Sequence, residues 1–236
     1  MNRRQVGITP RLSAALDLLN GSETVADVGS DHGKLAAALL QRGVCSRVVA
    51  SDISEQSLQK GIELIRHIGL EEKVDFRVGD GLQVLAPGEC DTIALLGMGG
   101  TLMCEILDTC DVPLMGAKAV VLQPMRAQRD IRSYLYRHDY RITDDRVIVD
   151  HGRYYQIFRA VPDTKRQELP ESFPKDFFDV GFVSFEQHDP NLPALCRLQL
   201  SEHGKQMRNA KGTEGEEKLR VRMEALNAIL AAYHGG

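Results

Sequence analysis

Tryptophan is absent from this chain, and aromatic residues make up only 6% of its 236 residues. The hydrophobic core must therefore be built mainly from Val, Ile, Leu and Ala. No C-x-x-C pair occurs among the five cysteines, and the odd count argues against a disulfide framework. The histidines show no metal-like spacing, so no metal site is expected.

An excess of positive charge is also missing, because 29 Lys and Arg face 33 Asp and Glu, for a net charge of −4. A nucleic-acid partner would therefore require a local basic patch. No apolar run approaches the ~18 residues of a membrane span, and the first residues do not open a signal peptide. We expect a cytoplasmic protein without membrane contact.

Short apolar runs alternate with helical patterns over the first 140 residues, which indicates βαβ units around a parallel sheet buried on both faces. The predicted helices include one that begins at Thr9-Pro10 and one capped by Ser54. The predicted strands cover residues 24–28, 47–52, 74–78, 92–96 and 119–122.

Two further strands, 142–149 and 154–161, are separated only by the turn His151-Gly152-Arg153, which predicts an antiparallel hairpin at the sheet edge. Five parallel strands followed by such a hairpin are typical of S-adenosylmethionine-dependent methyltransferases. The fold class is therefore α/β, with a Rossmann-like class I methyltransferase sheet.

The composition turns polar after Pro162, and residues 164–174 are expected to form a linker. Helical patterns over 192–207 and 214–233 predict a small C-terminal helical hairpin, resembling a short coiled coil. We expect two domains, residues 1–162 and 163–236.

The loop Asp27-Val28-Gly29-Ser30-Asp31-His32-Gly33 follows the first strand directly. Ligands of open α/β sheets bind at the carboxyl ends of strands, and Gly29 allows a close backbone approach. The helix that follows offers free N–H groups to a carboxylate. Asp31 would repel a pyrophosphate, which favours a ligand carrying an ammonium group. The alternative is a tight turn with a capping Asp.

Acidic residues also end the next two strands. Asp52 could accept hydrogen bonds from both ribose hydroxyls of an adenosine. The alternative is that Asp52 has no ligand, because Asp is common where a helix begins. Within Gly79-Asp80-Gly81, Asp80 could accept from the adenine amino group, although Asp-Gly is also a common turn.

Three glycines in the segment Gly97-Met98-Gly99-Gly100 imply a backbone that passes close to something flat or reactive. No Asn/Asp-Pro-Pro-aromatic loop, typical of exocyclic-amine methylation, follows this strand. Gln123 follows the fifth strand, and its side chain offers a hydrogen-bond donor and an acceptor to the edge of a base. Alternatively, this side chain makes hydrogen bonds to backbone groups at the edge of the sheet. Arg126, Arg129 and Arg132 could hold phosphates or form a solvated helix face.

Together, Ala26-Asp27-Val28-Gly29-Ser30-Asp31-His32, Gly97-Met98-Gly99-Gly100, Leu122-Gln123-Pro124 and Tyr154-Tyr155-Gln156-Ile157 resemble the TrmK-type bacterial tRNA (adenine-N1)-methyltransferases. The resemblance covers about residues 11–161. It implies S-adenosylmethionine as the cofactor, adenine at tRNA position 22 as the target, and a C-terminal helical domain that binds tRNA. The chain departs from the family at Gly33-Lys34, where Ala-Tyr is common, and at Asp52, where Glu is common.

Motifs and resemblance together predict three sets of site residues. The cofactor-binding set is Asp27, Gly29, Ser30, Asp31, His32, Asp52, Ile53, Asp80, Gly81, Gly97, Met98 and Gly99. The substrate-binding set is Lys34, Gly100, Pro124, Arg126, Arg129 and Tyr155. The catalytic residues are Asp31 and Gln123.

The oligomeric state is expected to be a monomer or a weak homodimer. Two alternatives to this function remain at this point. One is a methyltransferase acting on another RNA, a protein or a small molecule, and the other is a non-catalytic relative that binds RNA or protein.

Overall fold

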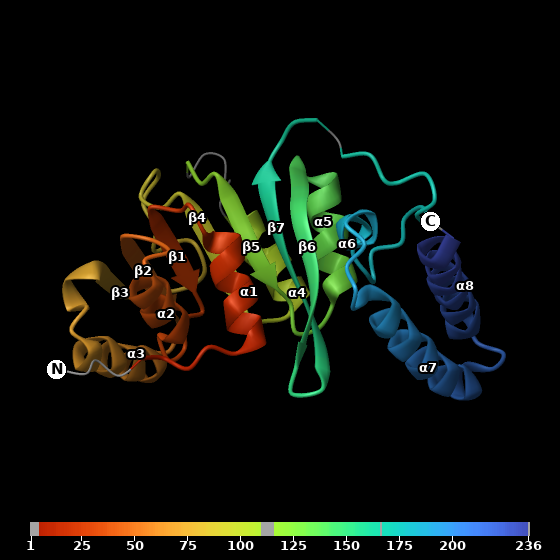
Figure 1. The fold of residues 1–236 in the computed structure, drawn as a ribbon, viewed down its shortest axis with the longest axis horizontal. Helices are drawn as coiled ribbons and strands as arrows, with labels where there is room; N and C mark the ends of the chain where they lie inside the picture. Colours follow the sequence, from red (N-terminus) through yellow and green to blue (C-terminus); the bar gives the residue numbers. More distant parts are fainter. Residues whose placement is uncertain (1–4, 110–115, 166, 236) are drawn as a thin grey trace.

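A computed structural model describes residues 5–109, 116–165 and 167–235. Within these residues seven strands form one sheet in the order β3-β2-β1-β4-β5-β7-β6 (Figure 1). The strands are β1 (Thr24–Val28), β2 (Arg47–Asp52), β3 (Val74–Val78), β4 (Thr92–Leu96), β5 (Ala119–Gln123), β6 (Tyr140–Asp150) and β7 (Arg153–Pro162). The helices are α1 (Pro10–Leu19), α2 (Lys34–Arg42), α3 (Glu55–Ile68), α4 (Gly100–Asp108), α5 (Gln128–Arg137), α6 (Phe182–Glu186), α7 (Leu192–Ala210) and α8 (Glu214–Gly235), with a short 3-10 helix at Glu71–Lys73.

Strands β1 to β5 run parallel, whereas β7 is antiparallel to both β5 and β6. The predicted parallel sheet with a terminal hairpin is confirmed. The strand order reverses between β1 and β4, so the connections leave these neighbours in opposite directions and open a crevice at their carboxyl ends.

Alternate residues of the central strands belong to two cores, one on each face of the sheet. On one face, Val25 and Val48 pack with the apolar sides of α1, α2 and α3. On the other face, Ala26 and Val49 belong to the core that includes α4 and α5. This burial on both faces explains why the parallel strands appear in the sequence as continuous apolar runs.

The helix ends follow the predicted signals. The Thr9 hydroxyl accepts a hydrogen bond from Leu12 N–H (3.2 Å), and Ser54 caps α3 in the same way through Ser57 N–H (3.2 Å). Gly43 ends α2 in the left-handed conformation. These caps satisfy backbone groups that a helix end leaves without an internal acceptor or donor.

The described residues of the segment 163–174 form no helix or strand, as expected of a linker, but two of them anchor the segment to the rest of the protein. The Gln167 side chain accepts from Ile142 N–H (2.8 Å) and donates to Ile142 C=O (2.9 Å). Phe173 lies 5.6 Å from Phe185 and 6.1 Å from Phe182, measured between ring centroids. These phenylalanines join the core of α4, α5 and the sheet, which also reaches α8.

Helices α7 and α8 pack side by side at one end of the molecule (Figure 1), as the predicted helical hairpin requires. The hydrophobic core continues across residue 162 into this part. The division into domains at that residue stays a prediction.

Arg132 departs from its expected place on a solvated or phosphate-binding face of α5. Its side chain is fully buried and donates two hydrogen bonds of 2.9 Å to the Asp145 carboxylate on β6. Its guanidinium carbon also lies 4.6 Å from the centre of the Phe158 ring. Arg132 is therefore a core residue, and phosphate binding by this side chain is excluded.

In the part of the chain that the structure describes, no helix is both long and apolar enough to span a membrane. Over the same residues, His, Cys, Asp and Glu side chains form no group of three or more suited to a metal ion.

Candidate functional site

The loop after β1 is fixed to the end of β2 by its own backbone. Gly29 N–H and Ser30 N–H both donate to Ser51 C=O, at 2.8 and 2.9 Å. Asp31 N–H donates to Asp52 Oδ2 at 3.2 Å. Gly29 has a φ of 76°, which favours glycine, and Asp31 adopts 46°. These three N–H groups are engaged, so a ligand carboxylate would have to take N–H groups of the first turn of α2.

A cavity of about 300 Å³ lies at the ends of β1 to β4, and we call it the strand-end cavity. It brings together seven of the predicted cofactor-binding residues from four separate loops. They are Gly29, Asp52, Ile53, Asp80, Gly81, Gly97 and Met98.

Asp52 is the main polar group of the strand-end cavity. Its Oδ1 accepts from Ser54 N–H at 2.8 Å, and its Oδ2 accepts from Asp31 N–H. Each carboxylate oxygen has a second lone pair that can accept a ligand hydroxyl. Ile53 is 74% exposed and Leu102 also lines the cavity. A carboxylate flanked by uncovered apolar side chains suits a ribose attached to a flat ring.

A second cavity of about 520 Å³ adjoins the first along Gly29, Leu96 and Gly97, and we call it the α1 cavity because α1 forms one wall. It brings together the predicted residues Asp27, Ser30, Asp31, His32, Lys34 and Gln123. One elongated ligand can therefore pass from the strand-end cavity to the α1 cavity, past the glycines that end β1 and β4.

Asp27 is the buried acid of the α1 cavity. Burial raises the pKa of its carboxyl from 3.8 to about 6, against the opposing effect of the Ser30 hydroxyl, which donates a 2.7 Å hydrogen bond. An ionised carboxylate in such a place attracts a cationic group strongly, because little water screens it.

Asp31, His32 and Lys60 form a chain of contacts at the mouth of the α1 cavity. His32 Nδ1 contacts the Asp31 carboxylate, and His32 Nε2 lies 3.2 Å from Lys60 Nζ. An ammonium group can only donate, so Nε2 is the acceptor and Nδ1 carries the hydrogen that Asp31 accepts. Lys60, on α3, was not predicted, because α3 is remote from the motif in sequence.

The loops after β4 and β5 are joined to each other. Gly97 N–H donates to Gln123 C=O (3.0 Å), and Gly100 N–H donates to Arg126 C=O (2.9 Å). A Cβ on Gly100 would lie 2.2 Å from Ala127 O, so this glycine is required by the approach of the two loops. Gly99 and Gly100 border neither the strand-end cavity nor the α1 cavity.

The remaining predicted substrate residues are dispersed. Pro124 is buried, Arg126 is exposed, and Arg129 borders a different cavity beside α8. Gln123 is buried and lines the α1 cavity, with its Nε2 3.4 Å from Met125 Sδ. Tyr155 lies behind Arg11, whose guanidinium carbon is 4.4 Å from the centre of the Tyr155 ring.

Arg11 was noted in the sequence only as one of several N-terminal arginines that could hold phosphates, and it was not predicted to line this cavity. It lines the cavity from α1 and donates from Nε to Asp150 Oδ2 at 3.1 Å. Its only signal in the sequence is a positive charge near the start of a helix, which is common.

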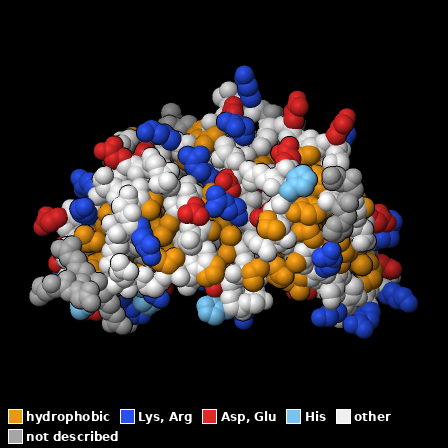
Figure 2. All heavy atoms as spheres, viewed as in Figure 1, with side chains coloured by type: hydrophobic (Ala, Val, Ile, Leu, Met, Phe, Trp, Pro, Cys, Tyr) orange, Lys and Arg blue, Asp and Glu red, His pale blue; other side chains and the backbone are white. Residues whose placement is uncertain are grey.

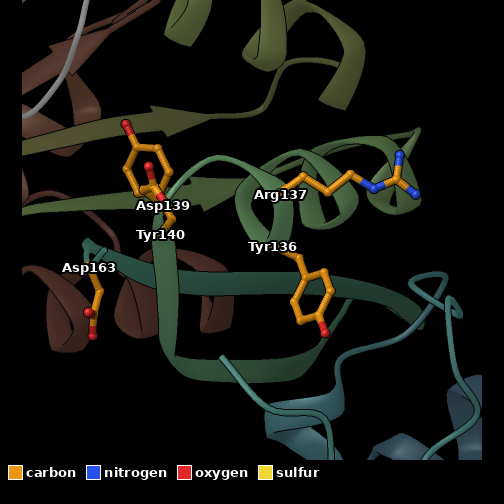
Figure 3. A pocket seen from close by; sticks show the side chains of 5 residues that line it. All are labelled: Tyr136, Arg137, Asp139, Tyr140 and Asp163. Atoms are coloured by element: carbon orange, nitrogen blue, oxygen red, sulfur yellow. The ribbon is translucent and has the colours of Figure 1, made fainter. Parts of the chain in front are cut away.

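A separate cavity of about 200 Å³ lies beside the end of α5 (Figure 3). Among its lining residues, Tyr140 pairs with Pro162 at the end of β7. Because β7 is antiparallel to β5, this cavity lies at the end of the sheet where β5 begins. It is remote from the strand-end cavity, and Figure 3 shows Arg137 extending away from Asp139 and Asp163.

Residues 8–158 match a family model described as "Methyltransferase domain". The chain is 29% identical over 156 residues to the tRNA (adenine(22)-N(1))-methyltransferase of Bacillus subtilis, and the match covers 66% of each chain. It thus spans just under two thirds of that relative.

Solved structures share the fold over almost the whole chain. The B. subtilis m1A22 tRNA methyltransferase TrmK has a TM-score of 0.81 at 25% identity, covering 96% of this chain and 100% of that one. A putative tRNA (m1A22) methyltransferase of Streptococcus pneumoniae, in complex with S-adenosyl-L-methionine, has a TM-score of 0.82 at 22% identity, covering 95% and 100%. The resemblance predicted from the motifs is confirmed.

Proposed function

Because this chain belongs to the methyltransferase-domain family, we propose that it transfers the methyl group of S-adenosylmethionine to N1 of an adenine in tRNA. The observation that carries the proposal is the pair of adjoining cavities. The strand-end cavity suits an adenosine, and the α1 cavity has room for the methionine part and an entering base. The relative from B. subtilis supports position 22 as the target.

The cofactor fits the groups present. Asp52 would hold the ribose hydroxyls, Ile53 would cover the adenine ring, and Asp80 would accept from its amino group. Asp27 and Asp31 would hold the ammonium group of the methionine part. These assignments use the polar and apolar groups that already border the two cavities.

S-adenosylmethionine supplies an electrophilic methyl group on a sulfonium ion. The neutral adenine N1 has a free lone pair, so this chain needs no general base to remove a proton from it. Gln123 and the backbone of Met98 would orient the base, and the target nucleotide must first leave its stack. The Asp31 carboxylate would stabilise the positive charge that develops on the ring.

The α7–α8 end is the proposed tRNA-binding region. Lys205, Arg208 and Lys211 are exposed there, and Figure 2 shows blue Lys and Arg side chains gathered over this end of the visible face. Such charges attract phosphates despite the net negative charge of the chain. We propose that the reaction takes place in the cytoplasm and that the protein is a monomer or a weak homodimer.

The direct test is incubation with methyl-labelled S-adenosylmethionine and a tRNA transcript, followed by nucleoside mass spectrometry. N1-methyladenosine is expected, and a transcript with guanine at position 22 should remain unlabelled. Label on another base would overturn the adenine-N1 assignment, and transfer to protein or a small molecule without tRNA would overturn the substrate class. Calorimetric absence of cofactor binding would indicate a non-catalytic relative.

Affinity for S-adenosylmethionine is expected to fall as the pH drops through about 6, by up to about tenfold per pH unit, because Asp27 must be ionised to hold an ammonium group. Calorimetric titrations between pH 5 and pH 8 measure this dependence. Asp27→Asn should bind weakly with a flatter profile, and an equally steep profile in that variant would rule Asp27 out.

The stability of the free protein should change in the opposite direction. Because the folded pKa of Asp27 is raised from 3.8 to about 6, ionising this buried group costs stability. Its contribution is favourable below about pH 4 and is lost as the pH rises through about 6. In acid, binding should therefore weaken while the contribution of Asp27 to stability increases. This combination distinguishes the protonation of Asp27 from acid unfolding of the protein.

A further inference from the structure

Arg11 connects the start of α1 to the tip of the β6–β7 hairpin. Its Nε donates to Asp150 Oδ2 at 3.1 Å, its guanidinium carbon lies 4.4 Å from the Tyr155 ring centre, and its Nη1 lies 3.8 Å from Met125 Sδ. Three groups, one each from β6, β7 and the loop after β5, therefore surround this guanidinium group.

The carboxylate that holds Arg11 lies inside the protein. Asp150 is buried, and its second oxygen contacts His151 Nδ1 at 2.7 Å. A buried carboxylate requires a compensating cation, which ties Arg11 to this position. The aromatic ring beneath the guanidinium group adds a cation–π contact.

The accessible part of Arg11 belongs to the α1 cavity. The side chain remains 35% exposed and lines the cavity together with Asp31 and Gln123, whereas Tyr155 does not line it. Arg11 therefore lies between the Tyr155 ring and the cavity. The planar group is covered on the side of the ring and is open toward the space where a base would enter.

We propose that Arg11 stacks on the target nucleobase in the α1 cavity, and that Tyr155 and Asp150 are positioning residues that hold its plane. This inference rests on the proposed function. Guanidinium planes and aromatic rings are the usual stacking surfaces for unpaired bases in RNA recognition. Because the ion pair with Asp150 neutralises the charge of Arg11, a base suits the site better than a phosphate.

Arg11→Lys is the decisive variant, because it keeps the cation for Asp150 and removes the plane. At saturating S-adenosylmethionine we expect kcat/KM for tRNA to fall about 5- to 150-fold, the range that loss of one stacked base implies. The dissociation constant for S-adenosylmethionine and the melting temperature should stay close to wild type. A rate within twofold of wild type would overturn the inference.

A salt titration distinguishes a stacked base from a phosphate. Losing one phosphate contact lowers the slope of log Kd against log salt by about 0.7–0.9. Arg11→Ala should leave the slope for tRNA unchanged, and a decrease of that size would assign Arg11 to a phosphate instead. Arg137→Ala is the matched control, since it removes the same charge at the remote end of the sheet (Figure 3), and its kcat/KM should equal that of wild type.

Tyr155 provides a test through the conservative variant. Tyr155→Phe keeps the ring beneath Arg11 and should retain kcat/KM, whereas Tyr155→Leu should lower it toward the Arg11→Lys value. Equal losses in both variants would show that the hydroxyl group matters and not the ring. If wild type itself methylates no tRNA, the proposed function fails, whereas an active wild type with an equally active Arg11→Lys variant refutes only this inference.

Discussion

Asp145→Ala is expected to lower the free energy of unfolding by about 3–5 kcal/mol, as loss of one member of a buried ion pair does. Arg132 is 0% exposed, and its Nε and Nη2 each donate a hydrogen bond to the Asp145 carboxylate. Removing the carboxylate leaves a guanidinium group in the core without a counter-charge. Urea denaturation followed by circular dichroism measures the difference.

The neighbouring acid is a matched control. Asp144 pairs with Arg146 at 2.9 Å near the surface, and its replacement by Ala should cost only about 0–1 kcal/mol. Equal losses from the two variants would contradict the assignment of Asp145 to the core. The double variant Arg132→Met with Asp145→Leu should recover much of the loss, because apolar side chains replace both charges.

Asp52→Ala is expected to weaken binding of S-adenosylmethionine by about 100-fold or more. Two hydrogen bonds from ribose to an ionised acceptor contribute roughly 1.5 kcal/mol or more each, and about 1.4 kcal/mol corresponds to a factor of ten. The same change removes the acceptor of the hydrogen bonds that Asp31 N–H and Ser54 N–H donate in the wild-type protein. Calorimetry with S-adenosylhomocysteine gives the dissociation constant without turnover.

Ser54→Ala separates the cofactor contact from the stability of α3. It removes the hydroxyl that caps the helix, at a cost of about 1 kcal/mol, and leaves the Asp52 carboxylate and the Ser54 backbone in place. Its dissociation constant should stay within about twofold of wild type. If Asp52→Ala binds as tightly as Ser54→Ala, the ribose is held elsewhere.

The placement of many candidate cofactor residues was predictable, because the ends of the strands can be located in the sequence. Apolar runs bounded by Gly and Asp locate the ends of β1, β2 and β4, and a parallel sheet brings those ends to one edge. Asp52, Gly97 and Gln123 follow from this rule, although 26 to 45 positions separate neighbours along the sequence. The hairpin was equally visible, since no helical pattern separates its strands.

The rest required contacts that no local pattern encodes. Arg11 and Asp150 are 139 positions apart, and their ion pair depends on how α1 packs beside the hairpin. Arg132 belongs to a series of arginines that resembles a solvated face, and only the register of β6 places Asp145 opposite it. Gly100 was predicted to approach a ligand, whereas it approaches the backbone of Ala127.

The phenylalanines at the joint between the sheet and the C-terminal helices have a consequence for how the molecule unfolds. Five of the seven phenylalanines in this aromatic-poor chain lie between residues 173 and 185, and they share one core with α5, β6 and α8. Melting the C-terminal helices would expose that core, so the two halves should lose their structure in a single cooperative transition. The proposed tRNA-binding region is thereby coupled thermodynamically to the sheet that carries the candidate cofactor site.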